Sequence, residues 1–185
     1  VQYSLACRKP DRAGGVVPYA QQHDRLVIAY SPLAQGLLGA RYDASHPPSG
    51  SARAGNPLFL PENLEMAQGL IDALRTVARS HDATPAQVAL AWVIRRPNVV
   101  AIPGASSIEQ LERNAEAADL ELSDDDDAWL TDESDRFRPV RGVAALPGLL
   151  AARRAAGRPS GPAPVDETAP EEVGAEVVDF ADSDA

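Results

Sequence analysis

Residues 99–114 constrain the fold of this chain more than any other stretch. They begin with Val-Val-Ala-Ile at 99–102, an apolar, β-branched segment typical of a buried strand, and pass through a Pro-Gly turn. Ser107 and Gln110 then have the spacing of a capping box, which begins a helix. The N–H groups at such a helix start suit an anion such as phosphate, although any βα unit of a parallel sheet shares the pattern. From this stretch alone, an anion-binding site and an ordinary βα unit both remain possible interpretations.

Charge and cysteine content narrow the function classes. A net charge of −10 over 185 residues argues against nucleic acid or an anionic membrane surface as a partner. Cys7 is the only cysteine, which excludes an intramolecular disulfide and a thiolate zinc cluster and favours a reducing, cytoplasmic location. The sequence contains neither an apolar run of about 18 residues nor the order of a signal peptide. Because Val1 is not a methionine, a fragment, an unusual start and processing all remain open.

The first sixty residues alternate strand and helix patterns. We expect a strand at 1–5, a loop at 8–12, a helix at 16–23 and a strand at 26–30. Residues 26–30 form a continuous apolar run, which predicts a parallel strand buried on both faces. Glycine and proline alternate from 31 to 61, so this stretch is expected to be a functional or disordered loop. Residues 40–60 within it carry no motif.

Helix signals dominate the next eighty residues. Apolar side chains at helical spacing predict an amphipathic helix at 62–81. Thr84, Pro85 and Gln87 have the N-cap, N1 and N3 pattern of a second helix, which is apolar on nearly all sides and ends before Pro97. Beyond residue 107, an apolar helix face is expected to continue through Leu111, Ala115 and Ala118.

A run of four aspartates, residues 124–127, follows Ser123. They fit the first turn of a helix that Ser123 caps, where negative charge is favourable. The alternative, a metal site, is disfavoured because successive helical residues point in different directions. From residue 140 the chain is rich in Ala, Pro, Gly and acids. Residues 140–185 are therefore expected to be a linker and tail, with one short helix at 143–156 and disorder from 157.

Three ordered motifs give this sequence a family resemblance. They are Ile-Ala-Tyr-Ser-Pro-Leu-Ala-Gln-Gly-Leu-Leu at 28–38, Thr-Pro-Ala-Gln-Val-Ala-Leu-Ala-Trp at 84–92, and Ile-Pro-Gly-Ala-Ser-Ser at 102–107 with Gln110 and Asn114. Together they closely resemble the aldo/keto reductase family over residues 1–139. The resemblance implies an α/β fold that is part of a TIM-type (β/α)8 barrel, about its last three βα units. It also implies NADPH-dependent interconversion of aldehydes or ketones with alcohols.

The resemblance assigns a cofactor-binding set by matching positions. Gln2 matches the residue whose amide holds the nicotinamide carboxamide, and Tyr30 matches the aromatic on which the nicotinamide stacks. The loop along the pyrophosphate is matched by Ser31, Leu33, Gln35 and Gly36. The site for the adenosine 2′-phosphate and adenine is matched by Gly104, Ser106, Gln110 and Asn114.

Two departures from the family pattern limit what the resemblance implies about the cofactor. Many members have lysine where Gly104 stands and arginine where Gln110 stands, so NADP(H) is expected with NAD(H) as an alternative, and Arg113 is the nearest substitute charge. Where Asp127 stands, the family has an apolar residue, which predicts weaker docking of that helix.

The catalytic groups of the family have no counterpart in this sequence. In the family, a tyrosine protonates the product alkoxide, a lysine and an aspartate lower the pKa of that tyrosine, and a histidine assists. The resemblance implies that all four belong to the first half of the barrel, which would precede Val1. Lys9 follows the first strand, and His23, His46 and His81 are expected to be surface histidines. We therefore assign no catalytic residue and no metal ligand.

Two function hypotheses follow. The first is the cofactor-binding half of an NAD(P)H-dependent reductase, which takes an aldehyde or ketone only when an N-terminal half completes it. The second is a non-catalytic nucleotide-binding or interaction remnant that pairs with another chain. Three strands cannot close a barrel, so the open edges predict a chain that is poorly stable or that self-associates.

Overall fold

The computed structural model describes residues 1–48, 53 and 55–156. Its α-helices and strands, in chain order, are α1 (Val16–Gln22), β1 (Val27–Tyr30), α3 (Pro61–Ser80), α4 (Pro85–Ile94), β2 (Val99–Ile102), α5 (Ile108–Glu116), α6 (Asp124–Arg136) and α7 (Leu146–Ala156). Short 3-10 helices lie at Lys9–Asp11, Ala34–Gly39, Pro57–Phe59 and Gly142–Ala145. In this part of the chain, no helix combines the length and the apolar character needed to cross a membrane.

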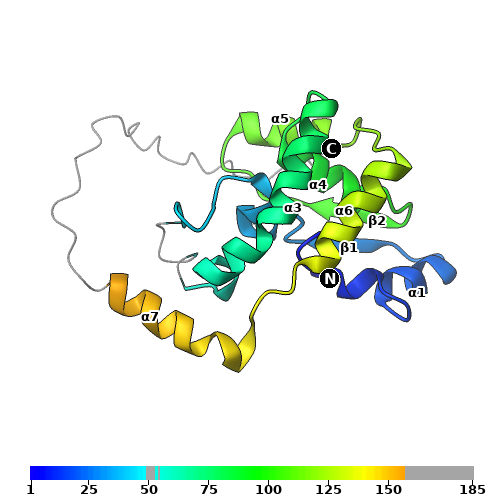
Figure 1. The fold of residues 1–185 in the computed structure, drawn as a ribbon. Helices are drawn as coiled ribbons and strands as arrows, with labels where there is room; N and C mark the ends of the chain where they lie inside the picture. Colours follow the sequence, from blue (N-terminus) through cyan, green and yellow to red (C-terminus); the bar gives the residue numbers. More distant parts are fainter. Residues whose placement is uncertain (49–52, 54, 157–185) are drawn as a thin grey trace, which may run out of the picture.

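The sheet is a parallel pair. Val27 of β1 lies opposite Val99 of β2, and Tyr30 opposite Ile102. Because side chains alternate along a strand, Val27, Ala29 and Val99 point to one face and are buried there. Helix α1 packs against β1 and helix α4 packs against β2 (Figure 1). Helices therefore cover one face of this sheet.

The opposite face of the sheet is open to solvent. Ile28 is 52% exposed and Ile102 is 56% exposed, and Tyr30 and Val100 lie on the same face. The prediction that the strand at 26–30 is buried on both faces is therefore wrong. The apolar run encodes a strand with two covered faces, but no element of the described residues covers the second one.

The predicted first strand, residues 1–5, is not a full strand: one bridge residue, Gln2, joins it to β1. Gln2 pairs in parallel with Tyr30, whose N–H donates to the carbonyl of Val1 at 2.9 Å. The chain then turns, and the Cys7 N–H donates back to the carbonyl of Ser4 at 2.9 Å. The sheet is consequently two strands and a bridge, unclosed, rather than three full strands.

The main core lies where α3 packs against α4 and α6. Figure 1 shows α3 and α6 alongside α4, with the strands close to them. Trp92 of α4 is fully buried at this junction, and its indole N–H donates to Thr131 of α6 at 3.2 Å. The guanidinium groups of Arg8 and Arg96 lie 5.0 and 5.1 Å from its ring centroid. The Arg8 contact, a cation–π interaction, thus joins the loop after Gln2 to the helical layer.

The predicted helix starts are confirmed. Thr84 and Gln87 form a capping box at the start of α4, and Ser123 caps α6 with Asp126 as its partner. Among the residues that the structure describes, no three or more His, Cys, Asp or Glu side chains are grouped so that they could hold a metal ion. Asp127, where the family has an apolar residue, pairs instead with Arg96 at 3.3 Å. An ion pair therefore holds the start of α6 where the family pattern supplies an apolar contact.

The apolar positions expected in the helix after residue 107 are exposed to solvent. Leu111 is 60% exposed, and Ala115 and Ala118 are exposed as well. Helix α5 buries no residue of its own, since it contacts mainly α4 and no other described element lies over its apolar side.

The segment after α6 remains attached to the core. The Val140 N–H donates to Asn63 Oδ1 at 2.7 Å, and Asn63 Nδ2 donates to the Val140 carbonyl at 3.0 Å. The predicted helix at 143–156 is present as the 3-10 turn Gly142–Ala145 followed by α7, which Figure 1 shows extending away from the other helices. The predicted disorder from residue 157 lies outside the described residues.

Candidate functional site

A groove of about 800 Å³ opens at the carboxyl ends of β1 and β2. Its walls are the loop after β1, the turn after β2 and the first turns of α4 and α5. Since β1 and β2 are parallel, the segments that follow them meet at one edge, which is where parallel α/β folds place ligands. The volume lies within the roughly 300–1,000 Å³ typical of small-molecule sites.

The groove gathers eight of the ten residues that the sequence assigned to a cofactor. These are Ser31, Leu33, Gln35, Gly36, Gly104, Ser106, Gln110 and Asn114. Gln2 and Tyr30 do not line it. They form the bridge that joins the N-terminal segment to β1, and Tyr30 is 49% exposed on the open face of the sheet.

The loop after β1 has an unusual backbone. Ser31, Gln35 and Gly36 have φ angles of 51°, 57° and 97°, all in the left-handed region. Ala34, at a φ of 48°, shares this conformation. A non-glycine residue costs about 1 kcal/mol there, so three such residues near one glycine form a strained turn. Strained turns concentrate at binding sites, where the backbone must present its polar groups in a fixed direction.

Two side chains from the long loop hold this turn in place. Arg53 Nε donates to the carbonyl of Gln35 at 3.1 Å, and Asn56 Nδ2 donates to Gln35 Oε1 at 2.9 Å. Arg53 also donates to the hydroxyl of Tyr42 at 3.4 Å. Gln35 therefore has both its carbonyl and its amide oxygen fixed.

The opposite wall is the start of α5. Ser107 Oγ accepts from the Gln110 N–H at 3.2 Å, as the capping-box spacing predicts. The Gln110 side chain does not return to Ser107, however. Its oxygen accepts from the N–H and the hydroxyl of Ser106, both at 3.0 Å. The predicted capping box is thus half formed, and Gln110 orders the turn one residue earlier.

Three arginines line the groove, and no carboxylate does within the described residues. They are Arg41, Arg53 and Arg113. Arg113 pairs with Glu109, one helical turn away, at 2.8 Å, and both side chains are more than half exposed. For a chain of net charge −10, this is a local reversal of sign that favours an anionic ligand.

Sequence reasoning missed Arg41, Tyr42 and Arg53. All three come from residues 40–60, which carried no motif. The only signal was basic residues inside a long Gly- and Pro-rich loop after a strand, and their placement depends on contacts such as that between Arg53 and Gln35. Thr84 and Gln87, identified as a helix start, also line the groove.

The groove contains none of the lysine and histidine residues considered for catalysis. His23 and His46 are exposed, as predicted, and Lys9 lines a different cavity. His81 is only partly exposed: 24% of its side chain is accessible and its Nε2 lies 3.0 Å from Asp126. It contributes to the packing of α3 on α6.

A family model described as the aldo/keto reductase family matches residues 1–132. The chain belongs to this family. An uncharacterized oxidoreductase of Mycobacterium bovis is 56% identical over 140 residues, which cover 76% of this chain and 42% of that protein. A probable aldo-keto reductase of Glycine max is 34% identical over 127 residues, covering 68% and 36%. The chain thus spans less than half the length of these relatives.

Solved structures of aldo-keto reductase type resemble this chain in fold. A thermostable aldo-keto reductase crystallised with the inhibitor epalrestat aligns with a TM-score of 0.53 and 28% identity over 72% of this chain and 38% of that one. A glycerol dehydrogenase of Gluconobacter oxydans aligns with a TM-score of 0.63 over 77% and 44%, and its 23% identity bears on the fold alone. The family and these oxidoreductase relatives place the chain among oxidoreductase sequences.

Proposed function

We propose that the groove binds the phosphate-bearing part of a nicotinamide dinucleotide, as the cofactor half of an NAD(P)H-dependent aldo/keto reductase. One observation carries the proposal. Eight residues matched to the family's cofactor set, drawn from two segments about seventy positions apart, converge on a single groove. The parallel pairing of β1 with β2 brings the two segments to one edge, and residues of both line the groove there.

The residues present fit a dinucleotide. The strained turn at Ser31, Gln35 and Gly36 would hold the pyrophosphate, because its backbone is fixed and Arg41 and Arg53 lie in the same groove. A Cβ placed on Gly104 would meet no atom within 4 Å, so the opposite wall leaves room for a bulky group. The start of α5 would take the adenosine end, where Gln110 and Asn114 offer amide donors.

Gln2 and Tyr30 would receive the nicotinamide end. Tyr30 directly precedes Ser31, presents half of its side chain on the open sheet face, and pairs with Gln2. When bound, the nicotinamide supplies or accepts the hydride that interconverts a carbonyl and an alcohol. The chain's own residues orient the ring, and we propose that the acid that protonates the alkoxide comes from outside this sequence.

We propose NADP(H) as the cofactor, with NAD(H) as the alternative. Arg113 is the cation nearest the predicted 2′-phosphate site in sequence, but Glu109 partly compensates its charge. The Schizosaccharomyces pombe relative, 28% identical over 124 residues, is named as an NADP(+) aldo-keto reductase. This supports the same choice.

A second candidate function is a non-catalytic nucleotide-binding module that pairs with another chain. The open sheet face favours it, because Ile28, Val100 and Ile102 are apolar and more than 40% exposed. Both candidates share the groove and differ only in whether the partner that covers this face brings catalytic groups.

Isothermal titration of the chain with NADP⁺ and NAD⁺, together with an NADPH-dependent aldehyde reduction assay, tests the proposal. We expect saturable binding, tighter for NADP⁺, and no turnover by the chain alone. Absence of binding at millimolar dinucleotide would contradict the groove assignment. Turnover above background that is lost in Tyr30→Ala would contradict the claim that this chain is catalytically incomplete.

A further inference from the structure

A second cavity, of about 410 Å³, lies away from the groove. It is formed by the loop after the Gln2 bridge and by the last turn of α6 with the segment that follows it. It shares no lining residue with the groove. A ligand here would therefore be independent of the proposed dinucleotide.

The lining of this cavity is strongly basic. Its cations are Arg8, Lys9, Arg12, Arg138 and Arg141. Within the described residues, Asp135 is its only carboxylate. Since the whole chain carries a net charge of −10, so many cations around one concave surface are not the average composition of this protein.

Asp135 of the cavity and the neighbouring Asp11 are already engaged by two of these arginines. Arg8 pairs with Asp11 at 2.9 Å, and both side chains are largely buried. Asp135 accepts hydrogen bonds from Arg12 and lies 3.4 Å from an Arg8 nitrogen. The pairs of Arg8 and Arg12 hold the N-terminal loop against α6.

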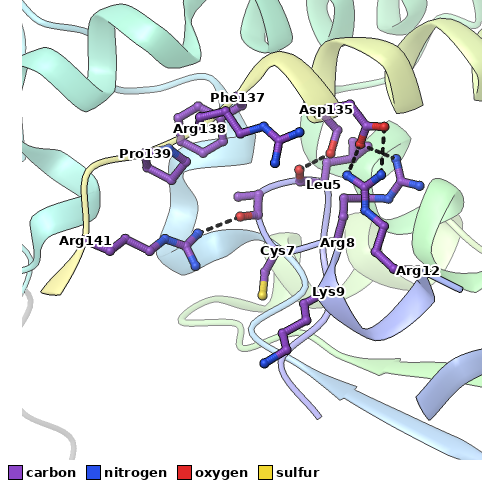
Figure 2. Close-up of a pocket in the computed structure, with 12 residues that line it drawn as sticks. Leu5, Cys7, Arg8, Lys9, Arg12, Asp135, Phe137, Arg138, Pro139 and Arg141 are labelled. Carbon is purple, nitrogen blue, oxygen red and sulfur yellow. Dashed lines mark hydrogen bonds and ion pairs between the residues drawn. The ribbon is translucent and has the colours of Figure 1, made fainter. Parts of the chain in front are cut away.

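The other three cations have no carboxylate partner in the described part of the chain. Arg141 donates to the carbonyl of Ala6 at 2.9 Å, a neutral acceptor that fixes the guanidinium without neutralising it. Figure 2 shows the Cys7 side chain between Arg141 and Lys9, with Arg138 beside Phe137 above them. Three cations thus line one cavity without a carboxylate partner among the described residues.

We propose that this cavity binds a small phosphate monoester. Guanidinium groups bind phosphate oxygens through paired hydrogen bonds, and a dianion matches several uncompensated cations better than a monoanion does. The volume exceeds what an inorganic phosphate needs, and Leu5, Ala6, Phe137 and Pro139 provide apolar wall for a short carbon skeleton. The phosphate contacts Arg138 and Arg141, with Lys9 at the opening.

Cys7 supplies a local readout for this proposal. It is the only cysteine, it is partly exposed, and it lines the cavity. A bound ester therefore shields the Cys7 thiol from the neutral alkylating agent iodoacetamide. The experiment measures the alkylation rate of the full chain against glycerol 3-phosphate, inorganic phosphate and sodium chloride at matched ionic strength.

We expect glycerol 3-phosphate to slow alkylation at least fivefold with saturation in the millimolar range, inorganic phosphate to act more weakly, and chloride to have no effect. Arg138→Gln raises the half-saturating ester concentration at least fivefold. Arg138→Lys, which keeps the positive charge, raises it less. The control Arg79→Gln, an exposed arginine at the end of α3 that lines neither cavity, leaves protection unchanged. Thermal melting checks that each variant is folded.

Three results would overturn the proposal. The first is no protection of the wild-type chain by the ester, and the second is equal protection in folded Arg138→Gln. The third is equal protection by inorganic phosphate and the ester, which would show a site for free phosphate alone. None of these outcomes depends on dinucleotide binding.

Discussion

The side-chain oxygen of Gln110 accepts hydrogen bonds from both the backbone N–H and the hydroxyl of Ser106, each at 3.0 Å. This pair locks the turn after β2 onto the first turn of α5. Because the same oxygen fixes both groups, the amide nitrogen of Gln110 keeps its donors for a ligand in the groove. The turn that the sequence marked as a helix start is therefore ordered by the residue matched to the 2′-phosphate site.

Replacing Gln110 by alanine tests this lock. Gln110→Ala removes both bonds to Ser106 and one donor to the ligand, so we expect NADP⁺ binding to weaken about five- to tenfold, or roughly 1 kcal/mol. Isothermal titration measures the change. Gln68→Ala, which removes an exposed bond to Asp72 on α3, is the matched control. Equal affinity for both variants would contradict a role of Gln110 in the groove.

Arg113 is expected to discriminate between the two dinucleotides. Arg113→Gln removes a cation near the proposed 2′-phosphate, so NADP⁺ affinity should fall about three- to tenfold while NAD⁺ affinity changes little. Arg136→Gln, which removes an exposed guanidinium that pairs with Glu133 on α6, is the control. Equal loss for both dinucleotides would place Arg113 near the pyrophosphate instead.

Tyr3 predicts a loss of stability at alkaline pH. Burial raises the pKa of Tyr3 above its ordinary value of 10.0, and the carboxylate of Asp11 acts in the same direction. The folded phenol keeps its proton while the unfolded one loses it, so the free energy of unfolding falls as the pH rises above about 10. In Tyr3→Phe this dependence should be shallower. Urea unfolding at about pH 9 and 11 measures it, and an unchanged slope would contradict the prediction.

Asp126 predicts a loss of stability in acid. Burial acts to raise its pKa, but hydrogen bonds with Ser123 and His81 outweigh it and lower the pKa of Asp126 below 3.8. Its stabilisation is present above that pH and disappears as the pH falls through the folded pKa. Asp126→Asn should lose about 1 kcal/mol at neutral pH and converge with the wild type in acid.

Asp125→Asn, an exposed neighbour in the same first turn, is the control for Asp126 and should change stability by less than about 0.5 kcal/mol. Thermal melting from neutral to acidic pH separates the two variants. Equal losses would show that charge in the turn, rather than the contact with His81, decides the stability.

The open sheet face predicts self-association. Ile28 is 52% exposed on it, so Ile28→Lys should shift the chain from associated species toward monomer in sedimentation velocity. Ile108→Lys changes an isoleucine that is 76% exposed on α5, away from the sheet. A monomeric wild type, or an equal shift in both variants, would show that the sheet face is not the contact.

Local signals predicted the elements well because their causes are local. The Thr84–Gln87 and Ser123–Asp126 hydrogen bonds span three residues, and β2 follows from four apolar residues in a row. The exposure of Ile28, where the prediction was wrong, and the exposure of Leu111 have one cause. An apolar side chain predicts burial from the sequence. Whether it is buried depends on a second element that packs over it.

The site was only partly predictable. Gly36 could be read as a turn residue, but the left-handed backbone of Ser31 and Gln35 leaves no mark in the sequence, since neither residue requires it. Arg41 and Arg53 reach the groove through tertiary contacts of a loop without periodicity. The basic cavity joins Arg8 to Asp135, 127 positions apart, a distance that no motif spans.

Amide mapping by nuclear magnetic resonance tests the groove most directly. Addition of NADP⁺ to the ¹⁵N-labelled chain should produce saturable shifts concentrated at Gly36, Gly104 and Asn114, on both walls of the groove. Glycines of this kind are well suited as probes because their amide signals are separate from most others. Saturable shifts at these three positions are the expected result, whereas shifts confined to other parts of the chain, or none at millimolar NADP⁺, would contradict a dinucleotide groove.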